Sequence, residues 1–289
     1  MKAQKILQTI SAAGLITTLL ASCSPTEEIN ALKQRTLDNL VFVKGGTFMM
    51  GDVGYEDESG QFRNFGPDAD AFPAHQVTLT SYSILRYEIT FAEYDFFAEV
   101  FGREKPYQRY RSQVNMGSNY PVHGVAWDES RNYCQWLGEL IGYPMDLPTE
   151  AQWEYAARSR GKAVAYATDN GEFEPGRNIR DATKVKREMP VGSWPPNPLG
   201  LYDMTGNVDE WTVDAWHIYQ EHSLVDPIYD EGMPKYSNSK VTRGSGIIGG
   251  RGQITLYVRA VREPDNTGAG IGIRCVANHP EPITEARAK

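Results

Sequence analysis

Cysteine, histidine and basic side chains are scarce in this sequence. Its 289 residues include three cysteines and five histidines, and 29 lysines and arginines stand against 37 aspartates and glutamates. Three cysteines are too few for a fold that depends on a disulfide framework. The formal net charge of −8 argues against binding to phosphate backbones, because proteins of that class present a basic stripe. We therefore expect no nucleic-acid partner.

Long apolar runs are also scarce, and the one at the N-terminus covers residues 6–21. Lys2 and Lys5 precede it, and small residues lead from it to Cys23. This pattern resembles a bacterial lipoprotein signal peptide, because the run is too short to span a bilayer comfortably; a membrane anchor helix is the alternative. The resemblance implies lipid on Cys23 and, because Ser24 rather than aspartate follows, an outer-membrane lipoprotein in the cell envelope that faces the periplasm or the exterior. Loss of the two lysines on cleavage changes the net charge from −8 to −10.

Core material is ample, since 40% of the residues are hydrophobic and 11% are aromatic. Glycine and proline are frequent and regular patterns are few, which favours a loop-rich α+β fold with a single domain. The sequence divides into a signal peptide, a polar tether without apolar periodicity, one globular domain and a tail. The expected boundaries of these four parts are 1–22, 23–39, 40–280 and 281–289.

Local patterns predict several elements within the domain. Short apolar runs around Gly45 and Gly46 predict a hairpin over residues 41–51, and residues 52–74 are expected to form an exposed loop. Capping boxes predict helices from Thr90 to Phe101 and from Thr149 to about Arg158. Apolar residues at three- and four-residue steps predict a third helix, Asp128–Leu140, which contains Cys134. We expect Cys134 and Cys275 to be core residues, or a pair if the fold brings them together.

Six stretches in a fixed order resemble the formylglycine-generating enzyme family, also called the sulfatase-modifying-factor domain. They cover nearly the whole chain after the tether, and one such stretch alone would be a weak signal. The resemblance implies a loop-rich variant of the C-type lectin fold with two principal helices. The stretches are residues 43–51, 87–90, 120–127, 147–158, 197–211 and 272–275.

One of these stretches carries a candidate calcium site. Carboxylates alternate with turns around glycine between residues 203 and 210, a pattern that gathers oxygen ligands around a hard cation. The resemblance implies side-chain ligands at Asp203 and Glu210 and carbonyl ligands at Gly206 and Val208; a turn capped by Asp203, with Glu210 solvated, is the alternative. A second family calcium site would begin at Asn178 and Ile179, but the acidic half of that site is not evident after them.

The catalytic cysteines of the family have no counterpart here. Active members bind copper through two cysteines in the segment that follows a Gly-Gly-Ser turn, and monovalent copper needs such thiolates. The corresponding residues 241–260 contain no cysteine. We therefore expect no copper and no catalytic residue of the family type.

The retained scaffold favours a lipid-anchored, non-catalytic relative that binds a protein or peptide of the cell envelope, such as an accessory factor of a secretion or gliding machine. An oxidoreductase of different chemistry on the same scaffold and a diversified lectin-fold ligand receptor are the alternatives. Arginine and tyrosine favour interfaces, so the expected binding surface is built from Arg243, Arg251, Tyr257, Arg259, Arg262, Glu263 and Asp265.

Overall fold

The computed structural model describes residues 24–66, 69–107, 111–112, 116–246 and 254–287. The expected signal peptide, its lipidation residue Cys23 and the candidate binding residue Arg251 lie outside the described residues. Within the described ranges, no helix is long and apolar enough to cross a membrane.

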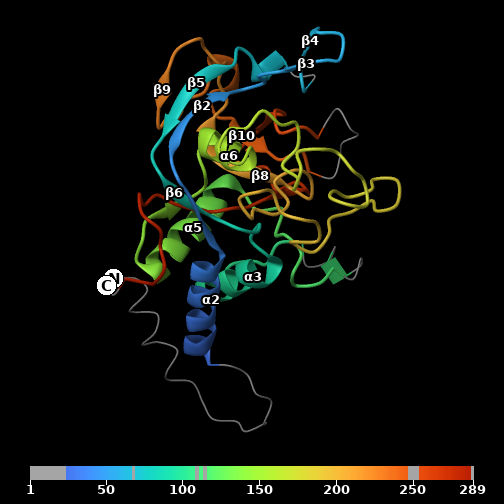
Figure 1. Ribbon diagram of the computed structural model, residues 1–289. Coiled ribbons are helices and arrows are strands. Elements are labelled where there is room, and N and C mark those ends of the chain that lie inside the picture. The colour runs from blue at the N-terminus through green and yellow to red at the C-terminus, as the bar shows by residue number, and fades with distance from the viewer. Residues whose placement is uncertain (1–23, 67–68, 108–110, 113–115, 247–253, 288–289) are drawn as a thin grey trace.

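The described chain begins with a helix, α2 (Pro25–Asn39), where the sequence favoured a polar tether. Ser24 and Glu27 form a capping box at its start, which satisfies backbone N–H groups that the first turn leaves unpaired. Leu32 and Thr36 are buried against helix α5 (Trp127–Ile141). Two buried positions on one face hold the second half of the helix to the body, whereas its first turns project from the body (Figure 1).

Two helices and a four-stranded sheet carry the first half of the core. Their apolar side chains form one large buried cluster, with α3 (Phe91–Phe101) and α5 packed beside the sheet. The strand order is β1-β6-β13-β7, so a strand from the C-terminal end lies in the middle of the sheet. The strands are β1 (Leu40–Val43), β6 (Tyr82–Leu85), β13 (Val276–Ala277) and β7 (Met145–Asp146).

The predicted hairpin over residues 41–51 is wrong. Strand β1 pairs with β6, whereas β2 (Gly46–Met50) pairs with β5 (His75–Leu79), so the chain passes from one sheet to another at Gly45. A Cβ atom on Gly45 would lie 2.2 Å from the carbonyl oxygen of Leu79. The glycine therefore serves a close approach between backbones rather than a hairpin turn.

The second half of the core lies around helix α6 (Glu150–Ala157), which contacts strands of two further sheets. A three-stranded sheet has the order β2-β5-β9, with β9 at Leu224–Val225. A four-stranded sheet has the order β11-β10-β8-β12. Its strands are β8 (Asp209–Ala215), β10 (Lys240–Arg243), β11 (Ala260–Arg262) and β12 (Ile271–Gly272). Short elements complete the set: the β3–β4 hairpin (Tyr55–Glu56 and Phe62–Arg63) and the 3-10 turns η2 (Ala69–Ala71) and η3 (Pro234–Tyr236).

The helix predictions are confirmed. Thr90 and Thr149 each cap their helix through a complete capping box, and α5 begins one residue before the predicted start. Between α6 and β8 the chain runs in turns and isolated bridges. This long irregular stretch, together with the sheets, gives the α+β, loop-rich architecture that the sequence predicts.

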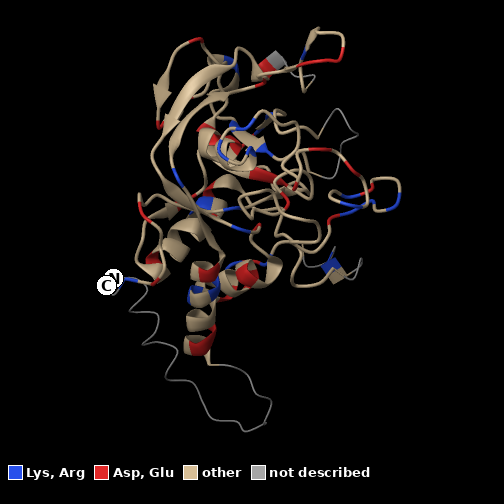
Figure 2. Ribbon diagram, viewed as in Figure 1, with Lys and Arg blue, Asp and Glu red and all other residues tan. Residues whose placement is uncertain are grey.

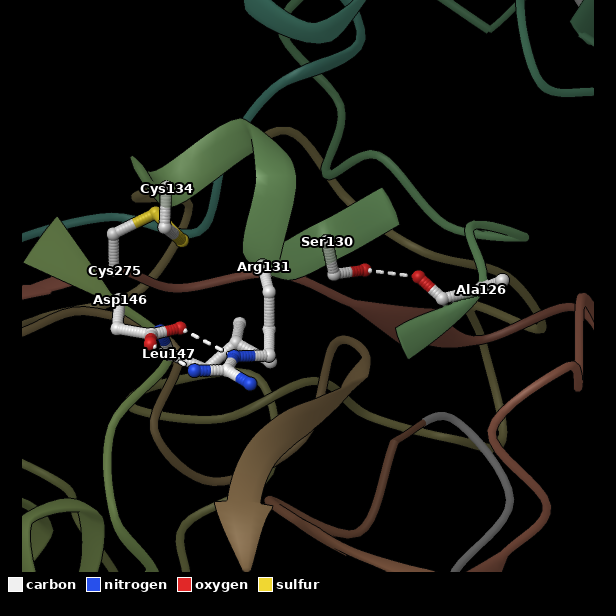
Figure 3. The surroundings of a disulfide bond; sticks show 7 residues. All are labelled: Ala126, Ser130, Arg131, Cys134, Asp146, Leu147 and Cys275. Atoms are coloured by element: carbon white, nitrogen blue, oxygen red, sulfur yellow. Dashed lines mark hydrogen bonds and ion pairs between the residues drawn. A yellow bond between two sulfur atoms is a disulfide. The ribbon is translucent and has the colours of Figure 1, made fainter. Parts of the chain in front are cut away.

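Cys134 and Cys275 form a disulfide bond, so of the two alternatives the structure contains the pair. Their Cα atoms are 5.5 Å apart and 141 residues separate them in the chain. The bond joins α5 to the residue before β13, and the nearby ion pair of Arg131 with Asp146 joins α5 to β7 (Figure 3). The expected tail also packs on this region, because Ile283 is buried and the backbone N–H of Arg287 donates to Ile141.

Candidate functional site

A buried ionic network joins α6 to two arginines, Arg243 at the end of β10 and Arg259 directly before β11. Arg243 donates to Glu150 Oε1 at 2.7 Å and to Glu154 Oε2 at 2.8 Å. Arg259 donates to both oxygens of Glu150, at 2.6 and 2.9 Å. In Figure 2, acidic (red) and basic (blue) positions lie on α6 and on the chain beside it in the middle of the molecule. The network therefore holds the chain at Arg243 and at Arg259, on both sides of the segment between them.

The prediction that Arg243, Tyr257 and Arg259 form an exposed binding surface is wrong. Their exposed fractions are 1%, 1% and 5%. The two guanidinium groups meet the carboxylates of α6, while the Tyr257 hydroxyl donates to the carbonyl of Val164. Burial alone would raise the pKa of Glu150, but Arg259 and Arg243 outweigh burial and hold this pKa below its usual value.

A cavity of about 380 Å³ lies beside this network. Arg262 lines the cavity, and Glu263 and Asp265 are exposed in the loop that follows β11. Alternate residues of this strand and its lead-in face the cavity, as expected from the period of two in an extended chain. The lining residues are Asp209, Ser245, Gly246, Val258, Ala260, Arg262, Asn266, Gly268, Ala269, Gly270 and Ile271.

Asp209 at the start of β8 is the buried charge of this cavity. Its Oδ2 accepts a hydrogen bond from Arg262 Nη2 at 3.1 Å and lies 3.5 Å from the hydroxyl of Thr242. Burial raises the pKa of Asp209, and Arg262 offsets only part of that effect. Sequence reasoning missed this residue, although a carboxylate directly before the buried Glu210 in a strand is a signal that could have found it.

Ser245 adds an unpaired polar atom to the cavity. It follows β10 with a φ of 60°, a left-handed conformation that is uncommon for a residue with a Cβ atom. Its hydroxyl is buried and forms no hydrogen bond with any of the described residues, and such groups carry an energetic cost when nothing pairs with them. The lining of the cavity therefore contains the buried carboxylate of Asp209 and the hydroxyl of Ser245, which has no hydrogen-bond partner among the described residues.

The candidate calcium segment lies next to this cavity, but Glu210 is already bound. Arg274 donates to Glu210 Oε1 from Nη2 at 2.7 Å, and Trp153 Nε1 donates to Oε2 at 2.7 Å. The side chain is fully buried, so the alternative of a solvated Glu210 is wrong as well. A cation would have to displace these bonds, and the structure therefore gives no support to Glu210 as a ligand.

Asp203 fits a cation better than Glu210 does. It has a left-handed backbone, and its Oδ2 accepts the N–H of Gly192 at 2.6 Å. Burial raises the pKa of Asp203 to about 6, and burial together with Asp203 and Glu210 raises the pKa of Glu88 well above its usual value. Among the described residues no group of three His, Cys, Asp or Glu side chains is placed to hold a metal. A cation here would rely on Asp203 together with the carbonyl oxygens of Gly206 and Val208.

The residues of the second candidate calcium site have structural partners. The amide of Asn178 donates to Asn170 at 3.0 Å and to the carbonyl of Glu172 at 3.1 Å, while its Oδ1 accepts the N–H of Glu174. Ile179 is buried in a small apolar cluster with Tyr166 and Ile254. This arrangement stabilises the turn by itself, and the amide oxygen of Asn178 is already used.

Comparison with known proteins identifies the family. The sulfatase-modifying factor enzyme 1-like domain matches residues 25–279, so the chain belongs to this family. It is 31% identical over 185 residues to the formylglycine-generating enzyme of Mus musculus, covering 58% of this chain and 47% of that protein. It is 27% identical over 300 residues to the inactive C-alpha-formylglycine-generating enzyme 2 of Bos taurus, covering 86% and 90% of the two chains.

A solved structure agrees with this assignment. PvdO from Pseudomonas aeruginosa superposes with a TM-score of 0.66 at 26% sequence identity, covering 82% of this chain and 93% of that one. The family and the fold class predicted from the six stretches are thereby confirmed. The chain spans about half the length of the mouse enzyme.

Proposed function

We propose that this protein is a non-catalytic member of the family, anchored by lipid on Cys23, that binds an extended segment of a protein or peptide partner in the cell envelope. The observation that carries the proposal is the cavity at Asp209 and Ser245, which opens beside a segment without cysteine. The likeness to a mammalian relative named as inactive supports the non-catalytic part. An accessory factor of a secretion or gliding machine is the kind of protein that we envisage.

The disulfide supports the proposed compartment, because such bonds persist in oxidising environments such as the periplasm and the cell surface. The disulfide joins Cys134 and Cys275 inside the domain. Helix α2 follows Cys23 directly and would act as a short spacer between a lipid and the domain.

We also propose calcium as a structural ion at Asp203, with carbonyl ligands from Gly206 and Val208. The support is the local charge: the buried carboxylates of Glu88, Asp203 and Glu210 share the single guanidinium of Arg274. A divalent cation would offset this excess of negative charge. No chemistry is assigned to the ion.

The binding proposal is tested by capturing partners from solubilised envelopes of the source organism with the lipidated full chain. Ala260→Trp fills the cavity, and Val225→Trp at the exposed strand β9 is the matched control. We expect the control to capture the same partner as the wild type and Ala260→Trp to lose it, with both variants unfolding at the wild-type temperature. Equal capture by the two variants would overturn the proposed site.

The non-catalytic part has its own test. The purified protein is mixed with a cysteine-containing peptide and with copper or iron, and oxygen consumption is followed together with the mass of the peptide. We expect neither to change. Consumption of oxygen with oxidation of the peptide would establish the oxidoreductase alternative instead.

A further inference from the structure

We propose that the cavity receives a cationic side chain, a lysine or an arginine of the bound segment, on the Oδ1 atom of Asp209. This inference rests on the proposed function and names the chemistry of the partner. It is carried by the geometry around Asp209, by the walls of the cavity and by the negative net charge of the chain.

One oxygen of Asp209 is bound and the other is not. Oδ2 lies within reach of Arg262 and Thr242, whereas no donor among the described residues forms a hydrogen bond to Oδ1. Gly246 lies over this oxygen, and a Cβ atom on Gly246 would stand 3.3 Å from it. Because glycine has no side chain, the approach to Oδ1 from the cavity stays open. A carboxylate has acceptor sites for a second donor.

The unpaired hydroxyl of Ser245 lines the same cavity as this carboxylate. An ammonium group has three donors and a guanidinium has five. One such group on Asp209 Oδ1 would bring its remaining donors into the cavity that Ser245 also lines. A neutral apolar side chain would bury both groups without pairing them, at a cost in free energy.

The cavity walls suit the stem of a long cationic side chain. Val258, Ala260 and Ile271 give the cavity an apolar side, against which the methylene groups of lysine or arginine can pack. The volume of about 380 Å³ lies in the range of ligand cavities in proteins. A side chain with an apolar stem and a charged end matches a cavity that has an apolar wall and the carboxylate of Asp209.

The surrounding charge favours a cation over an anion. Asp209 lies in the cavity wall, and its ion pair with Arg262 is formed through Oδ2. Glu263 and Asp265 are exposed in the loop that follows β11, and the whole chain carries a net charge of −8. Such a field attracts a basic segment and repels an acidic one.

The test uses small probes rather than an unknown partner. The amides of Nα-acetyl-lysine and Nα-acetyl-arginine, each as the N-methylamide, are titrated into the full-length protein, and backbone amide shifts are followed by NMR. The norleucine analogue, which has an uncharged side chain, is the reference probe. We expect saturable shifts at Asp209, Ser245 and Gly246 with the two cationic probes, and at least tenfold weaker binding of the norleucine probe.

Two variants and one control variant test where the probes bind. Asp209→Asn should weaken both cationic probes at least tenfold, whereas Glu231→Gln, which removes an exposed charge outside the cavity, should change their affinity less than twofold. Ala260→Leu narrows the cavity without touching the carboxylate and should also weaken the probes, which gives a result if Asp209→Asn folds poorly. Equal binding of lysine and norleucine probes, or unchanged binding to Ala260→Leu, would overturn the inference.

The outcomes separate this inference from the proposed function. If Ala260→Trp abolishes capture of an envelope partner but the cationic probes do not bind, the cation site is wrong and the binding function stands. If the probes bind at Asp209 but no partner depends on the cavity, the site stands and the proposed function fails.

Discussion

Arg259 forms two hydrogen bonds with the carboxylate of Glu150, from Nε at 2.6 Å and from Nη2 at 2.9 Å, and both side chains are buried. Glu150 is the first residue of α6, and Arg259 directly precedes β11, which forms a wall of the cavity. The pair therefore fixes β11, and with it one wall of the proposed binding site, against the start of helix α6. Its role is to support the site, since neither side chain lines the cavity.

Removing the charge of Glu150 should strongly destabilise the fold. Glu150→Gln leaves Arg243 and Arg259 buried with too little negative charge, and breaking such a pair costs about 3–5 kcal/mol. The measurement is the free energy of unfolding in urea. Glu231→Gln, at an exposed position, is the control and should stay within about 0.5 kcal/mol of the wild type. A loss below 1 kcal/mol for Glu150→Gln would contradict the importance of the network.

Asp214 should make the protein less stable as the pH rises from about 4 to about 7. Burial, followed by the charge of Glu150, raises the pKa of Asp214 to about 7. The folded state therefore holds a proton that the unfolded state releases near pH 4, and stability falls between about pH 4 and pH 7 by up to about 1.4 kcal/mol per pH unit. Asp214→Asn should remove this fall of the unfolding free energy with pH.

The pH measurement needs the difference between the two proteins, because a second group titrates in the opposite sense. Burial lowers the pKa of His217 to about 4. The contribution of His217 to the free energy of unfolding therefore rises with pH until the pH reaches the pKa of this side chain in the unfolded chain. Unfolding free energies of wild type and Asp214→Asn are compared from pH 5 to pH 8. Identical slopes for both proteins would show that Asp214 titrates normally.

Loss of the disulfide should lower stability by about 2–5 kcal/mol, because the bond closes a loop of 141 residues in the unfolded chain. The double variant Cys134→Ala/Cys275→Ala is compared with the oxidised wild type by thermal unfolding. Reduced wild type serves as the control and should resemble the variant. If the oxidised protein reacts with thiol reagents at Cys134 or Cys275, the pair is not formed.

Calcium should stabilise the protein and should do so less below pH 6. Its proposed ligand Asp203 has a pKa of about 6 because of burial, and a carboxylate must lose its proton before it binds a metal. Chelator-treated protein is titrated with calcium by calorimetry at pH 7.5 and pH 5. Asp203→Asn should abolish the heat, whereas Asp265→Asn should retain it. The absence of both heat and a thermal shift for the wild type would remove calcium from the site.

Local patterns predicted much of the fold. The capping boxes at Thr90 and Thr149 involve residues three positions apart, so sequence alone shows both partners. The hairpin over residues 41–51 was mispredicted because Gly45 resembles a turn residue, whereas its function is to allow close contact with β5. No local pattern distinguishes these two uses of glycine.

The sequence by itself determined the family, the starts of α3 and α6 and the absence of cysteine from residues 241–260, since each depends on residue identity and short spacing. Only the tertiary structure decided which arginines are exposed. Glu150 lies 93 residues from Arg243 and 109 from Arg259, and burial of a guanidinium is costly unless a carboxylate meets it. Asp209 and Ser245 share a cavity for the same reason, because the pairing of β8 with β10 brings them together.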